Sequence, residues 1–281
     1  MKKFLIFAAV ATMFAACSQN DDLVLQDKDT PIAIASAGVN DLVASRNATS
    51  LTEGSLGLYV GGTDLDKYTA TNLQWTYESG EWKNKGDELY FAGAGKQSAY
   101  AYHPYNATAY TNGFTTNGTT DLLWWKSAST LSAASLNISF THALSLLTIN
   151  LKKGTNVTEH ITGVKVGGTK VTATPNFPAN TWSEPIGEAT DITATVATPA
   201  SGMDATYTAL LIPQTTGALK ITVTAGNRTF VYTHSTDETF APGTAYTLTI
   251  TVGADNVEAG TISAAGWNIG ETGENDNLVT E

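Results

Sequence analysis

Residues 246–252, Tyr-Thr-Leu-Thr-Ile-Thr-Val, decide the fold class of this chain. The large apolar residues from Tyr246 to Val252 alternate strictly with threonine, a period of two that is typical of a β-strand with one buried face. Threonine suits the exposed face because its β-branched side chain favours the pleated backbone. Similar short apolar runs recur at 56–60, 73–77, 100–102, 138–140, 146–151, 161–166, 207–212, 219–223 and 230–232. We therefore predict an all-β chain, with one short helix near Leu131–Leu136.

Composition limits the classes of protein to which the chain can belong. It has 281 residues, a formal net charge of −11 and one cysteine. At roughly 150 residues per domain, this length corresponds to about two domains, each large enough to bury a core. The acidic balance argues against nucleic acid as a partner, because nucleic acid selects a basic surface. A single cysteine excludes a disulfide framework within one chain.

The first seventeen residues have the pattern of a bacterial lipoprotein leader. Residues 1–3 are Met-Lys-Lys, residues 4–14 are largely apolar, and residues 14–17 read Phe-Ala-Ala-Cys, which resembles a lipobox. We predict a signal peptide over residues 1–16 and a lipid on Cys17, which would anchor the precursor because each buried CH₂ contributes about 0.8 kcal/mol. The alternative is an ordinary secretory signal followed by a chance cysteine.

A propeptide-like segment over residues 17–46 precedes the main series of strands. Its residues 31–35, Pro-Ile-Ala-Ile-Ala, alternate large and small side chains like a short strand. The segment ends at Arg46, one of only two arginines, in a stretch without apolar periodicity where a protease could enter. A second break, Lys-Lys-Gly-Thr-Asn at 152–156, divides the later strands into two series. The predicted units are a segment over 17–46, an N-terminal β-sandwich over 47–156 and a C-terminal β-sandwich over 157–281.

Residues that commonly serve in catalysis or metal binding do not gather into a motif. The four histidines are scattered, without the spacing of metal ligands, and the sequence has neither a nucleophile elbow nor a phosphate-binding glycine loop. Asp64 and Asp66 form an Asp-x-Asp pair that we interpret as a solvated turn, because a calcium loop needs more ligands. We therefore predict no enzymatic activity, no metal site and no cofactor.

Trp124 and Trp125 form an unusual pair. Adjacent residues of a strand face opposite sides, so at most one tryptophan can lie in the core and the other should be at least partly exposed. An exposed tryptophan can contact a sugar or a partner protein, or a neighbouring loop can cover it. The pair is thus a candidate surface contact.

An ordered set of motifs resembles the fimbrillin-like proteins, which are lipoprotein precursors of type V pilus subunits. The N-terminal motifs are Cys17, Pro-Ile-Ala-Ile at 31–34, Ser-Arg-Asn-Ala-Thr at 45–49 and Gly-Ser-Leu-Gly-Leu-Tyr-Val at 54–60. The later motifs are Ala-Tyr-His-Pro-Tyr at 101–105, Asp-Leu-Leu-Trp at 121–124, Phe-Thr-His-Ala-Leu at 140–144, Leu-Ile-Pro-Gln at 211–214 and a closing stretch at 262–267.

This resemblance implies two tandem transthyretin-like Greek-key β-sandwich domains that polymerise with other pilin subunits by strand exchange. It implies that an Arg-specific protease cuts the outer-membrane precursor between Arg46 and Asn47, which yields an extracellular fimbrium that supports adhesion. The strand thereby removed would carry Ile32 and Ile34 as groove-filling residues, with Val39 and Leu42 as helpers. The donated strand is expected within residues 257–267, with Val257, Ala259, Ile262, Ala264 and Trp267 as its candidate residues.

A second reading of the sequence is a monomeric cell-surface β-sandwich lipoprotein that binds glycans or host proteins. The two readings differ in what they require of the chain. A pilin needs a removable first strand, a cleavage site and a spare C-terminal strand, because a sandwich that lacks one strand exposes unpaired backbone groups to which a neighbour's strand can bind.

Overall fold

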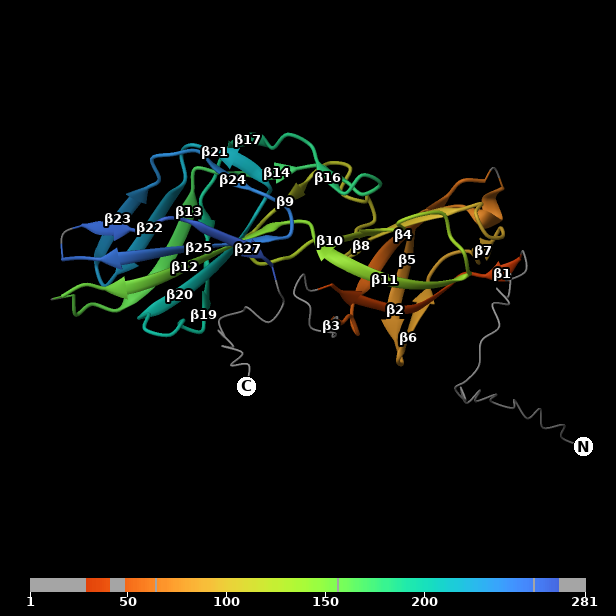
Figure 1. The fold of residues 1–281 in the computed structure, drawn as a ribbon, viewed down its shortest axis with the longest axis horizontal. Coiled ribbons are helices and arrows are strands. Elements are labelled where there is room, and N and C mark those ends of the chain that lie inside the picture. The colour runs from red at the N-terminus through yellow and green to blue at the C-terminus, as the bar shows by residue number, and fades with distance from the viewer. Residues whose placement is uncertain (1–28, 41–48, 64, 156, 255, 268–281) are drawn as a thin grey trace, which may run out of the picture.

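The computed structural model describes residues 29–40, 49–63, 65–155, 157–254 and 256–267. Within these residues the secondary structure is almost entirely β, and the helical element is a single 3₁₀ turn, η1 (Asp66–Tyr68). The prediction of an all-β chain is therefore confirmed. Figure 1 shows the strands arranged in two adjoining lobes, with β1 to β8, β10 and β11 in one and the strands from β12 onward in the other.

The N-terminal lobe is built on one eight-stranded sheet in the order β3-β2-β11-β10-β8-β4-β5-β6. The strands of this half are β1 (Thr30–Pro31), β2 (Ala33–Val39), β3 (Thr49–Ser50), β4 (Ser55–Gly61), β5 (Ala70–Glu78), β6 (Glu81–Asn84), β7 (Tyr90–Phe91), β8 (Ser98–His103), β10 (Leu123–Lys126) and β11 (Ser135–His142). The short strand β9 (Phe114–Thr115), which comes between β8 and β10 in the chain, lies with the other lobe (Figure 1). The sheet folds over on itself, because β2 contacts β6 although the two strands are not paired. Its apolar faces enclose one core that includes Leu56, Leu58, Phe91 and Phe140, all fully buried.

The C-terminal lobe packs a six-stranded sheet, β19-β20-β12-β25-β26 with β27 also on β25, against a four-stranded sheet, β18-β13-β22-β23. Its strands are β12 (Ser145–Lys153), β13 (Ile161–Gly167), β14 (Lys170–Ala173), β15 (Pro175–Asn176), β16 (Thr181–Trp182), β17 (Ile186–Ala189), β18 (Ile192–Thr193), β19 (Thr195–Ala197), β20 (Ala205–Leu211), β21 (Gln214–Thr216), β22 (Lys220–Ala225), β23 (Arg228–Thr233), β24 (Glu238–Phe240), β25 (Thr244–Val252), β26 (Val257–Ala259) and β27 (Ser263–Gly266). In β25 every second residue from Tyr246 to Val252 is buried and the threonines between them are half-buried, as the alternation predicts.

The strand pairing places β12 in the C-terminal lobe. We expected residues 47–156 to form the first unit, but β12 pairs antiparallel with β20 and parallel with β25, both strands of the second series. The physical reason is that Leu147, Ile149 and Leu151, on one face of β12, are fully buried in the core that the later strands form. The loop between the lobes also crosses the expected boundary, because β9 pairs with β14.

A third apolar cluster joins the two lobes. Tyr102 of β8 stacks on Phe177 of the second lobe, with ring centroids 4.2 Å apart. The Tyr102 hydroxyl has two acceptors within reach of its single proton, Asn72 Oδ1 at 2.6 Å and the Asn106 carbonyl at 2.7 Å. Burial raises the pKa of Tyr102, and the same cause raises the pKa of the neighbouring Tyr59 to about 12. The tyrosines therefore stay neutral and serve as packing and hydrogen-bonding groups.

The short helix expected near Leu131–Leu136 is not formed, so that prediction is wrong. The backbone of this segment is bound to neighbouring strands instead. Leu131 N–H donates to the Gln97 carbonyl at 2.6 Å, and the Ala134 carbonyl accepts from Ala33 N–H at 3.0 Å. These bonds hold a bent, non-helical segment in place, and β11 begins directly afterwards at Ser135.

Candidate functional site

The first-strand segment, residues 29–40, lies in an apolar groove of the N-terminal lobe. Ile32 and Ile34 are 4% and 5% exposed, and both belong to the core of that lobe. Full burial of an isoleucine side chain contributes about 1.5–3 kcal/mol. The segment is thus an integral part of the core.

A β-bulge sets which residues of β2 face the groove. Leu136 of β11 pairs with Ile34 and Asn137 pairs with Ser36, so one residue of β2, Ala35, has no counterpart. Because of this extra residue, the inward face continues at Ala37 and Val39, which are 5% and 6% exposed. Val39 was expected as a helper, whereas Ala37 was missed because a strict period of two places it on the other face.

The segment spans two strand edges. Its first part binds β7, since Asp29 and Ile32 donate from their backbone N–H groups to the Phe91 and Leu89 carbonyls at 2.9 and 2.8 Å. Its second part, β2, runs parallel to β11 and antiparallel to β3. Without this segment, β7 and β11 would both present unpaired backbone groups beside apolar side chains.

Asp29 fixes the start of the segment by polar contacts. Its carboxylate accepts from Lys67 Nζ at 2.7 Å and from the buried Tyr68 hydroxyl at 2.5 Å. The hydrogen bond to Asp29 raises the pKa of Lys67. This exposed ion pair contributes little to stability, so apolar burial and the backbone pairing of β2 hold the segment.

The C-terminal arm, residues 257–267, lies on its own lobe. Its strands β26 and β27 pair antiparallel with successive parts of β25, and all four residues of β27 are exposed. Ile262 and Ala259 pack partly against the core of the second lobe. Ala264 pairs with Tyr246, and its side chain is exposed. The arm is therefore an edge element with little apolar burial.

Trp267 is the residue that anchors the arm. It is 7% exposed and stacks on His142 of β11 with ring centroids 3.6 Å apart. Asp121 Oδ2 and His142 Nδ1 form a hydrogen bond of 2.6 Å, which orients the imidazole ring. Neither His142 nor Asp121 was singled out for this contact from the sequence, because residues far apart in the chain meet here only through the fold.

Several expected site residues lie outside the described residues. These are Cys17, Leu42, Arg46 and Asn47, together with Asp64. Asp66 lies in η1. Within the described part of the chain, no group of three or more His, Cys, Asp or Glu side chains could hold a metal ion. No helix among the described residues has the length and apolar character needed to cross a membrane.

The tryptophan pair faces two different cores. Trp124 is 3% exposed and belongs to the cluster between the lobes, whereas Trp125 is half-buried and packs against the N-terminal core. Trp124 is thus fully buried and Trp125 stays partly exposed, because neighbouring residues of a strand face opposite sides. Because Trp125 is largely covered by its own lobe, it presents less aromatic surface to a ligand than the sequence suggested.

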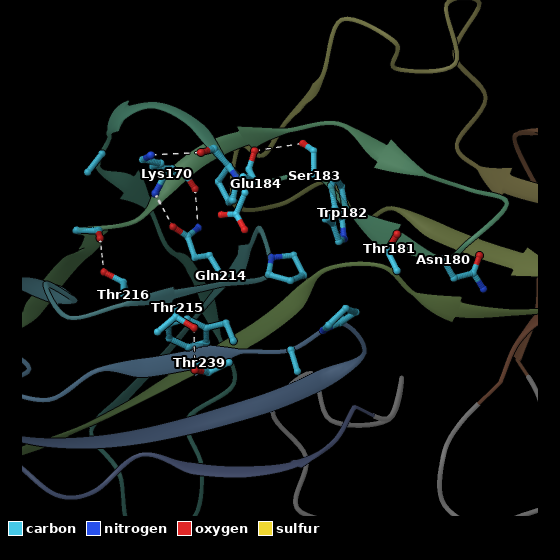
Figure 2. Close-up of a pocket in the computed structure, with 17 residues that line it drawn as sticks. Lys170, Asn180, Thr181, Trp182, Ser183, Glu184, Gln214, Thr215, Thr216 and Thr239 are labelled. Atoms are coloured by element: carbon cyan, nitrogen blue, oxygen red, sulfur yellow. Dashed lines mark hydrogen bonds between the residues drawn. The ribbon is translucent and has the colours of Figure 1, made fainter.

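A hollow of about 710 Å³ in the second lobe is shown in Figure 2. Most of its polar side chains bind one another or the backbone, whereas the buried Asn180 Oδ1 has no hydrogen-bond partner among the described residues. Gln214 exchanges hydrogen bonds with the backbone of Lys170, and Lys170 Nζ donates to the Pro185 carbonyl at 3.2 Å. Thr215 and Thr239 share a hydrogen bond of 2.9 Å. These bonds serve to join loops, and they leave most of the hollow's polar groups occupied.

Comparison with known proteins identifies the class that this architecture defines. The family model described as fimbrillin-like matches residues 45–267, so the chain belongs to the fimbrillin-like family. This membership supports the role of a structural fimbrial subunit at the cell surface, not that of an enzyme. No curated protein sequence matches the chain significantly.

Solved structures share the fold at low identity. A Bacteroides ovatus protein provisionally assigned to cell adhesion has a TM-score of 0.68 and 18% identity, over 86% of this chain and 99% of that one. A similarly assigned Bacteroides uniformis protein has a TM-score of 0.63 and 19% identity, over 85% of this chain and 99% of that one. A fimbrial protein from Bacteroides vulgatus has a TM-score of 0.54 and 16% identity, over 86% of this chain and 100% of that one. At these identities the likeness establishes the fold alone.

Proposed function

We propose that this chain is a structural subunit of a type V pilus that is exported as a lipoprotein precursor, cleaved after Arg46 and polymerised by donor-strand exchange. The pilus would support adhesion. Family membership supports the fimbrial role. The lipid on Cys17 would hold the precursor at the outer membrane, and an Arg-specific protease would separate residues 1–46 from the mature chain.

The observation that carries this proposal is the position of residues 29–40. They fill an apolar groove with Ile32 and Ile34 and bind the edges of β7 and β11. Their removal would expose buried side chains of β11 next to unpaired N–H and C=O groups. Such an edge binds an added strand through a backbone ladder, with specificity from alternate side chains.

The C-terminal arm supports the second half of the mechanism. It contacts its own lobe as a pair of short edge strands and buries little beyond Trp267. Detaching it would leave the central pairing of β12 with β20 and β25 intact. Head-to-tail insertion of one arm into the next groove does not close on itself, so it generates a filament.

Replacement of Arg46 with Ala tests the maturation step. The variant should remain as a lipidated, unpolymerised precursor, whereas wild-type fibres should contain a chain that starts at Asn47 and has 281 − 46 = 235 residues. Arg228→Ala is the matched control, because Arg228 is the other arginine and lies at the β22–β23 hairpin. N-terminal sequencing of sheared fibres gives the readout. Normal fibres that start at Asn47 in the Arg46→Ala strain would contradict the proposal.

A further inference from the structure

Two segments far apart in the chain have nearly the same sequence. Residues 34–40 read Ile-Ala-Ser-Ala-Gly-Val-Asn, and residues 262–268 read Ile-Ser-Ala-Ala-Gly-Trp-Asn. The first, fourth, fifth and seventh positions are identical, the second and third exchange Ala and Ser, and the sixth replaces one apolar residue with another. The first segment is β2 with Asn40, and the second contains β27 and Trp267.

The groove explains the pattern in the first segment. Its inward residues are Ile34, Ala37 and Val39, and the unequal spacing between them results from the bulge at Ala35. Ser36 lies on the exposed face, where its hydroxyl donates to Asn137 Oδ1 at 2.7 Å. A segment that fits this groove therefore needs apolar or small residues at positions one, four and six.

The second segment meets that requirement but does not use it where it lies. Ile262, Ala265 and Trp267 occupy positions one, four and six. On β25, however, Ala265 is exposed and Ile262 is only half-buried. The pairing of β27 with β25 also continues without a bulge from Ser263 to Gly266. The pattern of the arm thus matches the groove of β2 better than the edge on which the arm lies.

We propose that residues 262–267 of one subunit replace residues 34–39 in the groove of the next subunit, in the same register and direction. This inference rests on the proposed function and adds the register of the exchange. Ile262 would lie opposite Leu136, Ala265 opposite Ile138 and Trp267 opposite Phe140, as Ile34, Ala37 and Val39 do in the precursor.

The size of Trp267 is compatible with this register because of where Val39 lies. Val39 is the last residue of β2, and the following Asn40 is exposed. Val39 itself is 6% exposed, so an indole at this position would lie at the end of the groove and extend toward the exposed position of Asn40. The exchange replaces the stack of Trp267 on His142 with this new contact, while Ile262 and Ala265 gain burial.

Cysteine cross-linking in assembled fibres tests the register. The only cysteine of the chain is Cys17, so a mature chain that starts at Asn47 has none. In the proposed register Ala264 takes the place of Ser36, which pairs with Asn137. Fibres of the variant A264C/N137C should therefore show a ladder of disulfide-linked subunits on non-reducing gels. The matched controls are A264C/S135C and A264C/S139C, since both serines are exposed and each lies two residues from Asn137 on β11.

The outcomes separate the register from the function on which it rests. Stronger cross-linking of either serine variant would overturn the register, while donor-strand exchange would stand. Fibres without cross-links in all three variants would show that the arm does not lie beside β11, so the register and donation by the arm would fail, while the role as a fibre subunit would stand. A folded, cleaved wild-type chain that forms no fibres would also overturn both.

A reversible lock gives a second test of arm release. Thr247 and Ser263 pair across β25 and β27, so T247C/S263C should close a disulfide that holds the arm on its own lobe. The oxidised variant should fold normally but form no fibres, and reduction should restore assembly. Wild-type assembly by the oxidised variant would overturn both the register and the donor role of the arm.

Discussion

Replacing Ile32 and Ile34 with aspartate measures how strongly the first strand binds its groove. Both side chains are about 95% buried in the N-terminal core. Truncation of a buried isoleucine to alanine costs about 2–5 kcal/mol, so the pair contributes on the order of 4–10 kcal/mol. Two carboxylates in the same place add a desolvation cost. Because the total stability of a domain is about 5–15 kcal/mol, the segment should leave the groove rather than bury the charges.

If the segment detaches, the variant loses no more stability than the free energy with which residues 29–40 bind the lobe. The double variant should therefore melt at the same temperature as a chain that begins at Asn47. A loss of at least about 4 kcal/mol corresponds to a decrease of roughly 8–16 °C in the melting temperature. Differential scanning calorimetry of residues 18–281, at neutral pH and with Cys17 absent, gives the comparison with the unmodified chain.

The matched control places the same charges on the other face of the strand. Ala33 and Ala35 are exposed neighbours of the two isoleucines. The variant Ala33→Asp/Ala35→Asp should lose only about 1 kcal/mol per site, which reflects the lower strand propensity of aspartate. If the isoleucine and alanine variants melt at the same temperature, burial of Ile32 and Ile34 does not hold the segment, and the reasoning fails.

Three further predictions concern the arm, a crowded glycine and a buried histidine. Deletion of residues 257–281 should give a chain that accepts a strand but donates none, so trace amounts of it should shorten wild-type fibres. Circular dichroism must show that the truncated chain folds. Its polymerisation at the wild-type rate would contradict C-terminal donation. Gly168→Ala should destabilise the second lobe by several kcal/mol more than Gly187→Ala. Both glycines have positive φ, but only at Gly168 would a Cβ lie 1.7 Å from a backbone oxygen. Equal melting temperatures of the two variants would refute this prediction. Burial lowers the pKa of His103 from its ordinary 6.5, although the Ser55 carbonyl, Asp121 and Glu53 oppose the shift. Protonation therefore favours the unfolded state, and the melting temperature should fall from pH 7 to pH 5 by more in the wild type than in His103→Gln; equal falls would assign the pH dependence to another group.

Periodicity predicted the central strands well because each has one strongly apolar face. The alternation in β25 and the apolar run of β12 both correspond to buried strands. Periodicity failed where backbone pairing overrides the local pattern. Residues 131–136 form no helix because their N–H and C=O groups bind neighbouring strands, and β12 belongs to the second lobe because its partners come later in the chain. Such long-range pairing leaves no signal in a local window.

The candidate site shows the same division. Ile32 and Ile34 were identifiable because they alternate with alanine, whereas Ala37 was not, because a bulge shifts its phase. The contact of Trp267 with His142 and Asp121 joins residues separated by more than a hundred positions, and only the structure reveals it. Sequence alone therefore predicts which segments have strand character, but not which edge each of them binds.

The sequence pattern shared by residues 34–39 and 262–267 lies in two different environments, and this difference favours assembly in one direction. In β2 the pattern is buried and paired on both sides, with β11 and β3 as neighbours. In β27 it is exposed, and among the described strands its partner is β25. Cleavage would empty the first environment and leave the second occupied, so a strand that moves from an edge to a groove gains apolar burial and a second neighbour. In the proposed mechanism, peptide-bond cleavage would make this step irreversible, because the original strand would no longer be tethered at high effective concentration beside its groove. Assembly in this scheme needs no nucleotide, since folding of the precursor has already stored the required difference in burial.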